Sequence, residues 1–209
     1  MGCDIHVCCE ARWTIDGVKK WYSVDHYKKN KYYIDEDKCS ETEWDIVPIF
    51  DDRNYILFSI LADVRNYSNN KPICEPRGLP DDVSKTVKKE ADDWGCDGHS
   101  HSWFTLKELL NYKLEHSKEH HSGYISEQQA KDLENGVTPD SWCQSTNISG
   151  YVYKEWDDEL TSSFQKLINA LMDRACKEFY IYSWMDDSNK KKAIEKIAND
   201  IRIVFWFDN

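Results

Sequence analysis

Two short segments of the chain place carboxylate and imidazole side chains at the spacing of one β-strand face. They are Asp4-x-His6, close to the first residue, and Asp97-x-His99-x-His101. Residues at i and i+2 of a strand point to the same side, roughly 6.5 to 7 Å apart, so both can address one ligand. This combination suits zinc, manganese or iron. Asp4, His6, His99 and His101 are therefore candidate ligands of a divalent metal, with a solvated polar face as the alternative.

Arginine and histidine side chains elsewhere in the chain suit a small anion instead. A guanidinium donates two parallel hydrogen bonds to a phosphate or carboxylate, and the candidates are Arg53, Arg65 and Arg77, with Arg202 as a further member. We expect His99 and His101 in a loop directly before a helix, where free backbone N–H groups also attract anions. Internal salt bridging is the alternative for the arginines. The predicted ligand-binding residues are His6, Arg53, Arg65, Asn66, Arg77, His99, His101 and Trp103.

A nucleotide-derived molecule is the ligand that these side chains fit best. Trp103, Tyr67 and Trp206 can stack on a base, and stacking contributes about 1 to 3 kcal/mol per base. The formal charge of −11 argues against long nucleic acids, whose binding needs clustered Lys and Arg. We therefore predict that the loop ending at Trp103 closes over the face of Asp4 and His6 and sequesters a small anionic, nucleotide-derived ligand.

Two other functions stay open from the sequence. Asp97-x-His99-x-His101 is similar to the His-x-His metal motifs of phosphoesterases and metallo-β-lactamase-like hydrolases, although the Asp-His pair that follows in those enzymes is missing. A metal held here and by Asp4 and His6 would activate water for phosphoester hydrolysis. The acidic surface could instead block a host protein. The sequence leaves enzymatic activity, metal content and homo-oligomer formation undecided.

The eight cysteines indicate a reducing environment rather than a disulfide framework. The sequence opens without a basic and apolar leader, contains no apolar run of roughly 18 residues, and has no Cys-x-x-Cys pair. We expect a cytoplasmic protein without a membrane span, with all eight thiols reduced. Cys8 shares the predicted strand face with His6, and an imidazole there could activate a thiol nucleophile. The spacing of two residues makes that pairing unfavourable.

The metal and ligand candidates depend on strands at both ends of the chain. The first strand should run through Trp13, turn at Asp16-Gly17 and return through Val24, because Asp-Gly is a strong hairpin signal. The apolar run 201–207 predicts a buried strand, which we place beside the first one. This pairing would put Asp4 and His6 near the middle of a sheet, with their polar face partly covered.

Helical periodicity and capping residues predict the remaining elements. The expected helices are 55–62 after an N-cap at Asp51 or Asp52, 84–89, 106–112, 126–134, 160–179 and 188–199. Residues 25–45 are expected to form a surface excursion, and 115–150 a lid-like insertion. The predicted fold is α+β, a small and mainly antiparallel sheet covered by helices, in a single domain spanning 1–209.

Five segments carry a resemblance to a family of bacteriophage-encoded proteins. They are Gly2-Cys3-Asp4-Ile5-His6, Arg53-Asn54-Tyr55 with Leu61-Ala62-Asp63-Val64-Arg65-Asn66, Pro76-Arg77-Gly78-Leu79-Pro80, Asp97-Gly98-His99-Ser100-His101-Ser102-Trp103 and Phe205-Trp206-Phe207-Asp208-Asn209. The similarity spans most of the chain. It implies a viral origin, expression in a bacterial cytoplasm and an accessory or counter-defence role, and it assigns no reaction.

Overall fold

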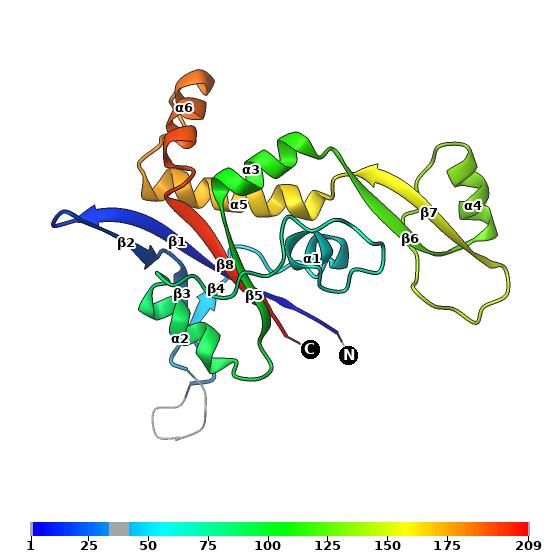
Figure 1. Ribbon diagram of the computed structural model, residues 1–209, viewed down its shortest axis with the longest axis horizontal. Coiled ribbons are helices and arrows are strands. Elements are labelled where there is room, and N and C mark those ends of the chain that lie inside the picture. Colours follow the sequence, from blue (N-terminus) through cyan, green and yellow to red (C-terminus); the bar gives the residue numbers. More distant parts are fainter. Residues whose placement is uncertain (1, 34–41, 209) are drawn as a thin grey trace. The chain divides into compact units, whose positions relative to one another are not determined.

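A four-stranded antiparallel sheet forms the centre of the fold. The computed structural model describes residues 2–33 and 42–208. The strand order is β2-β1-β8-β5, with bounds β1 (Ile5–Ile15), β2 (Val18–Ser23), β5 (His99–Thr105) and β8 (Ile201–Phe207). Figure 1 shows the first and last strands side by side in this sheet. The predicted α+β class and the pairing of the terminal strands are confirmed.

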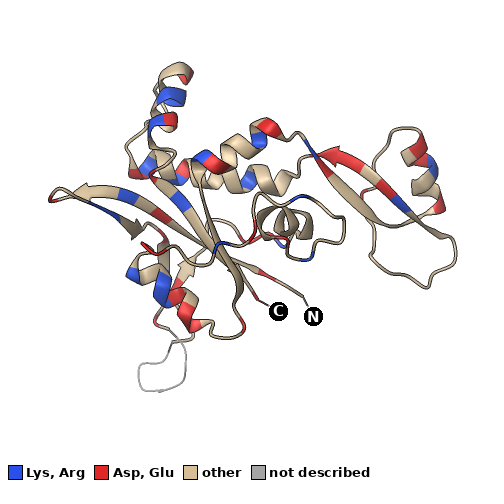
Figure 2. Cartoon of the chain, in the orientation of Figure 1, with Lys and Arg blue, Asp and Glu red and all other residues tan. Residues whose placement is uncertain are grey.

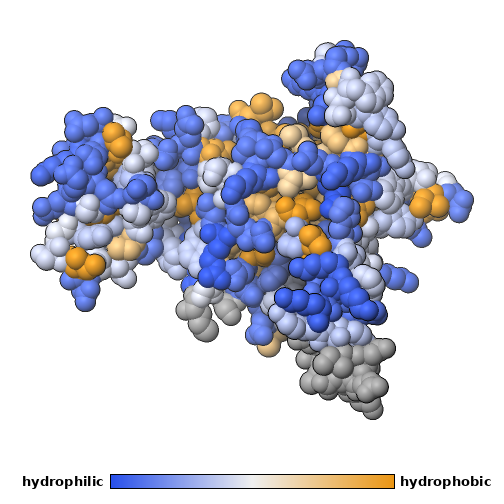
Figure 3. Space-filling view, turned by 180° about the vertical axis from the view of Figure 1, so that it is seen from behind, coloured by the Kyte–Doolittle hydropathy of each residue, from blue (hydrophilic) through white to orange (hydrophobic). Residues whose placement is uncertain are grey.

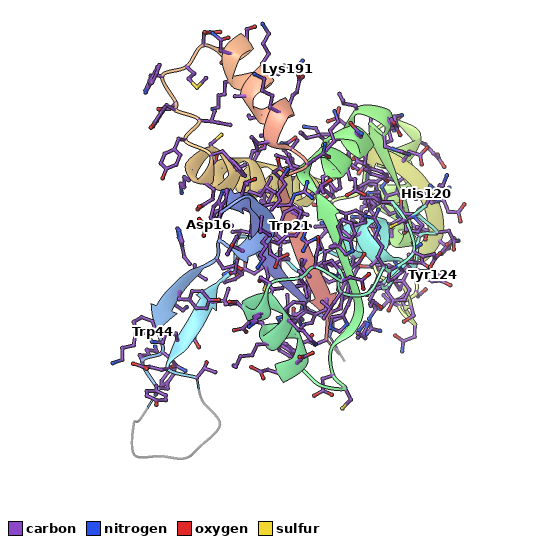
Figure 4. All side chains as sticks on the ribbon, turned by 60° about the vertical axis from the view of Figure 1, so that its left-hand side comes forward. Asp16, Trp21, Trp44, His120, Tyr124 and Lys191 are labelled. Carbon is purple, nitrogen blue, oxygen red and sulfur yellow. The ribbon has the colours of Figure 1, made fainter. Side chains whose placement is uncertain are left out.

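The β1–β2 hairpin forms where the sequence predicts it. Asp16 and Gly17 both have positive φ, 52° and 76°, as the two-residue turn of a right-twisted hairpin requires. Ile15 pairs with Val18 across this turn, and Figure 4 labels Asp16 at its tip. A glycine at the second turn position adopts this conformation without steric cost.

The two faces of β1 are both covered. Cys3, just before β1, and the alternate β1 residues Ile5, Val7, Cys9 and Ala11 are buried on one side. On the other side, Cys8 packs with Val204 and Trp206 of β8 against Val87 and Ala91 of α2 (Lys85–Asp93). The polar face of the first strand is therefore partly covered, as the sequence analysis predicted, although the Asp4 side chain stays 47% exposed.

Several helices begin directly after a residue whose side chain accepts a hydrogen bond from a backbone N–H of the first turn. In α1 (Tyr55–Ala62) the N-cap is Asn54, whose side chain accepts from the Leu57 N–H, so the predicted cap at Asp51 or Asp52 was wrong. A polar side chain caps only when it reaches the N–H two or three residues ahead. The other caps are Ser84 for α2, Ser126 for α4 (Glu127–Glu134) and Asp186 for α6 (Asp187–Ile197).

In α3 (Leu106–Glu115), the Thr105 hydroxyl accepts from the Glu108 N–H, and the Glu108 carboxylate accepts from the Thr105 N–H in return. The remaining helix is α5 (Ser162–Glu178), which agrees with the predicted 160–179. Both α2 and α6 carry lysines and acidic residues, and in α2 the lysines precede the acidic residues, as Figure 2 shows.

Two predicted loops contain strands. The segment from His99 to Trp103 belongs to β5, so it is not a loop ahead of a helix N-terminus. The predicted surface excursion 25–45 includes β3 (His26–Lys29) and leads into β4 (Trp44–Val47), and these two strands pair with each other. Its acidic run 35–37 and Cys39 lie outside the described residues. Polar residues on a sheet edge resemble a loop in composition, which explains these errors.

The chain divides into two compact units. The first comprises Met1–Arg53, Arg77–Leu109 and Leu167–Asn209, and the second comprises Asn54–Pro76 and Leu110–Lys166. The second contains α4 and the paired strands β6 (Lys118–Ser126) and β7 (Tyr151–Glu159). The predicted insertion 115–150 falls within this second unit, and the single domain predicted for 1–209 stays a prediction.

No helix among residues 2–33 and 42–208 combines the length and the apolar character needed to cross a membrane. On the face drawn in Figure 3, hydrophilic residues surround small groups of apolar ones.

A buried carboxylate lies beside the central strands. Asp25 accepts the Cys9 N–H with both oxygens, at 2.9 and 3.1 Å, and a hydroxyl hydrogen bond from Ser23. Burial raises the pKa of the Asp25 carboxyl from 3.8 to about 6, although these hydrogen bonds act in the opposite direction. The folded protein therefore binds a proton between about pH 4 and pH 6 that the unfolded chain has already released.

This pKa predicts that Asp25 lowers stability as the pH rises. Its contribution to the free energy of unfolding is most favourable below about pH 4 and falls by roughly 3 kcal/mol as the pH passes 6. The variant Asp25→Asn cannot titrate. Denaturant unfolding of both proteins between pH 4 and pH 7 should show the wild type losing stability relative to the variant across this window. A difference that is independent of pH would contradict the prediction.

Candidate functional site

A pocket of about 360 Å³ lies over the start of β1, within the first unit. We call it the His6 pocket, and its lining residues are Asp4, Ile5, His6, Val7, Cys8, Ile46, Pro48, Asp51, Glu90, Trp94 and Trp206. The strand brings Asp4, His6 and Cys8 to its floor because alternate side chains share a face. Its volume falls in the range of small-molecule sites, about 300 to 1,000 Å³. The structure therefore has a concavity above Asp4 and His6.

His6 is held between an aromatic ring and a carboxylate. Its imidazole lies against the indole of Trp94, with ring centroids 3.9 Å apart, and 5.9 Å from the ring of Trp206. Its Nε2 is 3.2 Å from the Asp208 carboxylate. Asp208 also accepts the Asp4 N–H at 2.9 Å. These contacts fix the plane of the imidazole at the side of the pocket.

The neighbouring Asp4 is paired with an arginine. Arg53 Nε donates to Asp4 Oδ1 at 2.6 Å, and its Nη2 donates to the second oxygen. The hydrogen bond from Arg53 holds the pKa of the Asp4 carboxyl below its usual range. Internal pairing therefore accounts for Arg53, which the sequence analysis assigned to an anion. The carboxylate partner is Asp4.

Carboxylates dominate the charged lining of the His6 pocket. Asp4, Asp51 and Glu90 all line it, and burial raises the pKa of the Glu90 carboxyl. An anionic group placed among them would meet like charge. Groups that donate hydrogen bonds, such as the N–H edge of a heterocycle, fit this lining much better.

The two histidines of the second predicted segment point to opposite faces of the sheet. His99 pairs with Phe207 and lies 6.1 Å from its ring, whereas His101 lies 5.8 Å from the ring of Trp206. Phe207 and Trp206 are consecutive in β8 and so face opposite sides. The register shifts between His99 and Ser102, where Ser100 has a φ of +52°. His99 and His101 therefore cannot address one ligand together.

Neither histidine is placed to meet an anion at a helix end, because the helix begins only after Thr105. Burial lowers the pKa of the His101 imidazole, and His99 lowers it further, which favours the neutral form. The expected anion site ahead of this helix was therefore wrong.

The proposed metal ligands do not converge. Across the described ranges 2–33 and 42–208, no group of three or more His, Cys, Asp or Glu side chains is arranged to hold a metal ion. His6 and Asp4 already bind Asp208 and Arg53, and His99 lies on the other sheet face. The prediction of a metal at Asp4, His6, His99 and His101 gains no support from this geometry.

The remaining predicted ligand residues are distributed elsewhere. Arg65, Asn66 and Tyr67 belong to the second unit, where the Asn66 side chain bridges Asp63 and the Asn70 backbone within one turn. This is the pattern of a side chain that shapes a loop. Arg77 and Trp103 line a different pocket of the first unit.

The sequence analysis missed three features of the His6 pocket. Trp94 continues the apolar spacing of Val87 and Ala91 at i, i+4 and i+7, a signal that α2 extends past its predicted end at Lys89. Asp208 follows the last strand and lies opposite Asp4, so the predicted strand pairing implied its position. Asp51 and Glu90 have no such signal, because only the tertiary fold places them here.

Cys8 is a core thiol rather than a nucleophile. It is buried, and burial raises the pKa of its thiol well above the ordinary value, with further increases from Asp25 and Glu90. A thiolate is the reactive species, so the activation by His6 weighed above is opposed by this environment. No disulfide joins the seven cysteines that the structure describes, Cys3, Cys8, Cys9, Cys74, Cys96, Cys143 and Cys176.

Thiol alkylation should separate these sites. Cys96 is exposed and should react with iodoacetamide in the native protein, whereas Cys8 and Cys9 should react only after unfolding. Mass spectrometry of peptides after brief labelling, with and without denaturant, gives the rates. Labelling of Cys8 at the rate of Cys96 in the native protein would show an accessible thiolate and overturn this assignment.

Comparisons of the chain with protein-family models, curated proteins and solved structures found no match.

Proposed function

We propose that the protein binds and sequesters a small nucleotide-derived ligand, whose base enters the His6 pocket. The observation that carries this proposal is the combination of aromatic rings and carboxylates around a pocket of about 360 Å³. Trp94, His6 and Trp206 line it, and Trp94 and His6 are partly exposed whereas Trp206 is buried. Stacking on such rings contributes about 1 to 3 kcal/mol per base.

The carboxylates favour a base with a donor-rich edge. A carboxylate accepts two hydrogen bonds side by side, and guanine presents two adjacent N–H donors, whereas adenine presents only its amino group. Asp4 is paired with Arg53, and Asp51 and Glu90 are the other carboxylates in the lining. Guanosine should therefore bind more tightly than adenosine.

The phosphate of such a ligand would lie outside the carboxylate lining. Asp4, Asp51 and Glu90 repel it, and Arg53 is already bound to Asp4. This arrangement revises the predicted mode, in which arginines clamp the anionic group and the base stacks beside it. Recognition through the base predicts that a nucleoside binds about as tightly as its monophosphate.

Sequestration fits the site better than hydrolysis. The Cys8 thiol is held in its protonated form, and the imidazole Nε2 of His6 is already bound to Asp208. Among the phage-encoded proteins that the sequence resembles, capture of a nucleotide signal would serve a counter-defence role by withholding that signal from the host.

Isothermal titration calorimetry tests this function. The panel contains guanosine, adenosine, their 5′-monophosphates, and cyclic dinucleotides of each base. We expect saturable heat with guanosine and with guanine nucleotides, and chromatography of the mixture should return the ligand intact. Cleaved ligand would replace sequestration with hydrolysis. The absence of heat with every compound would overturn the proposal.

A further inference from the structure

A second pocket, of about 810 Å³, lies on the same sheet face beyond the N-terminal end of α2. We call it the arginine pocket, and its lining residues are Arg12, Trp21, Arg77, Leu79, Pro80, Asp81, Asp82, Trp103, Thr105, Asn199 and Arg202. All of them belong to the first unit. Arg12 on β1 and Arg202 on β8 point to the face covered by α2, because they alternate with buried residues of the opposite face.

Guanidinium groups and indole rings alternate in this pocket. Arg12 lies 4.9 Å and Arg202 3.9 Å from the ring centroid of Trp21. Arg202 also lies 5.5 Å from the ring centroid of Trp103, and Arg77 lies 4.9 Å from the ring of the same tryptophan. Figure 4 labels Trp21 on β2 within this part of the sheet. Such stacking fixes flexible arginine side chains, so that less entropy is lost when they bind an anion.

Arg202, the most buried of these arginines, has one buried and one exposed carboxylate partner. Arg202 is 2% exposed and donates from Nε to Glu10, which is fully buried. It donates from Nη1 to Asp82 at 2.8 Å. The Asp82 side chain is 62% exposed, and its second oxygen accepts from the Trp21 indole N–H at 2.9 Å. Glu10 is thus an integral core partner, whereas Asp82 approaches from the solvent side.

We propose that the arginine pocket binds the phosphate groups of a small anion, and that the Asp82 carboxylate occupies the position of one of them. Two donors, a guanidinium N–H and an indole N–H, converge on one exposed carboxylate, and a phosphate oxygen pair satisfies the same two donors. Arg12 and Arg77 line the space around it, which is larger than the Asp82 side chain needs. This site is independent of the base recognition proposed for the His6 pocket.

The donors freed by removing Asp82 set the direction of the expected effect. Arg12, Arg77 and Arg202 each keep another carboxylate partner, namely Asp200, Glu108 and Glu10. Removing Asp82 leaves one guanidinium N–H of Arg202 and the Trp21 indole N–H without their carboxylate acceptor. An incoming phosphate would then bind without having to displace the carboxylate, so the variant should bind more tightly than the wild type.

Inorganic pyrophosphate is the probe, because it has no base for the His6 pocket. Calorimetric titrations compare the wild type with Asp82→Ala and Asp82→Asn, which remove the charge with and without the side-chain volume. We expect both variants to bind pyrophosphate about tenfold more tightly than the wild type, since each frees a charge-assisted hydrogen bond. Thermal unfolding confirms that the variants are folded.

The matched control is Asp81→Ala, which removes the same charge from the same pocket lining. It should change the affinity less than about threefold, because no hydrogen bond of Asp81 to Arg202 or Trp21 is present. Adding Arg77→Gln to Asp82→Ala should reverse most of the gain. Equal affinities for the wild type and both Asp82 variants, an equal gain in the Asp81 control, or no pyrophosphate binding by a folded Asp82 variant would each overturn the proposal.

Discussion

Replacing Trp94 with alanine should weaken guanosine binding on the order of 10- to 100-fold. The indole of Trp94 lines the His6 pocket and holds the imidazole of His6 at a ring-centroid distance of 3.9 Å. Its removal deletes the stacking surface of Trp94 and leaves the His6 imidazole free to move. The combined loss should exceed the contribution of a single ring. The measurement is calorimetric titration of guanosine into the wild type and the variant.

Two variants make this prediction specific. Trp94→Phe retains a ring and should keep part of the affinity. Trp184→Ala removes an indole that is 79% exposed and far from the lining residues in sequence, and it should bind guanosine as the wild type does. Wild-type affinity in the folded Trp94→Ala variant would place the ligand elsewhere.

The largest expected effect on stability comes from Arg202→Met. This change leaves the Glu10 carboxylate fully buried, and among the described residues the Ser84 N–H still donates to it, at 2.7 Å. Removing one partner of a buried ion pair costs about 3 to 5 kcal/mol, because the other charge remains without water. Denaturant unfolding at pH 7 should show a loss of this size.

The controls separate the buried charge from lost packing. Adding Glu10→Gln to Arg202→Met removes that charge, keeps an acceptor for Ser84 and should recover a large part of the stability. Lys88→Ala breaks the exposed pair with Asp92 and should change stability by less than about 0.5 kcal/mol. A loss in Arg202→Met that the second substitution leaves unchanged would assign the effect to packing against Trp21 and Trp103.

The strands at the two chain ends could be predicted because their signals are local. The turn at Asp16-Gly17 and the apolar run 201–207 each specify an element without reference to the rest of the chain. Their pairing then followed from the need to bury two apolar faces together. The floor of the His6 pocket was predictable for the same reason, since alternation along β1 alone brings Asp4 and His6 together.

The ligand set around that floor could not be predicted in the same way. Whether His99 and His101 share a sheet face depends on the register shift in β5, and no residue type in this segment predicts that shift. The partner of each arginine depends on tertiary contacts, such as Arg53 with Asp4 and Arg202 with Glu10. Charge in the His6 pocket was misjudged because Asp51 and Glu90 reach it from segments far apart in sequence.

Nuclear Overhauser contacts between bound guanosine and the aromatic rings test the central proposal most directly. The protein would carry labelled tryptophan and histidine, with Trp94→Phe and His6→Gln variants used to assign the signals. We predict contacts from the base H8 proton to the Trp94 indole and the His6 imidazole. Contacts to Trp21 or Trp103 instead, or guanosine binding without any contact to Trp94 and His6, would contradict base recognition in the His6 pocket.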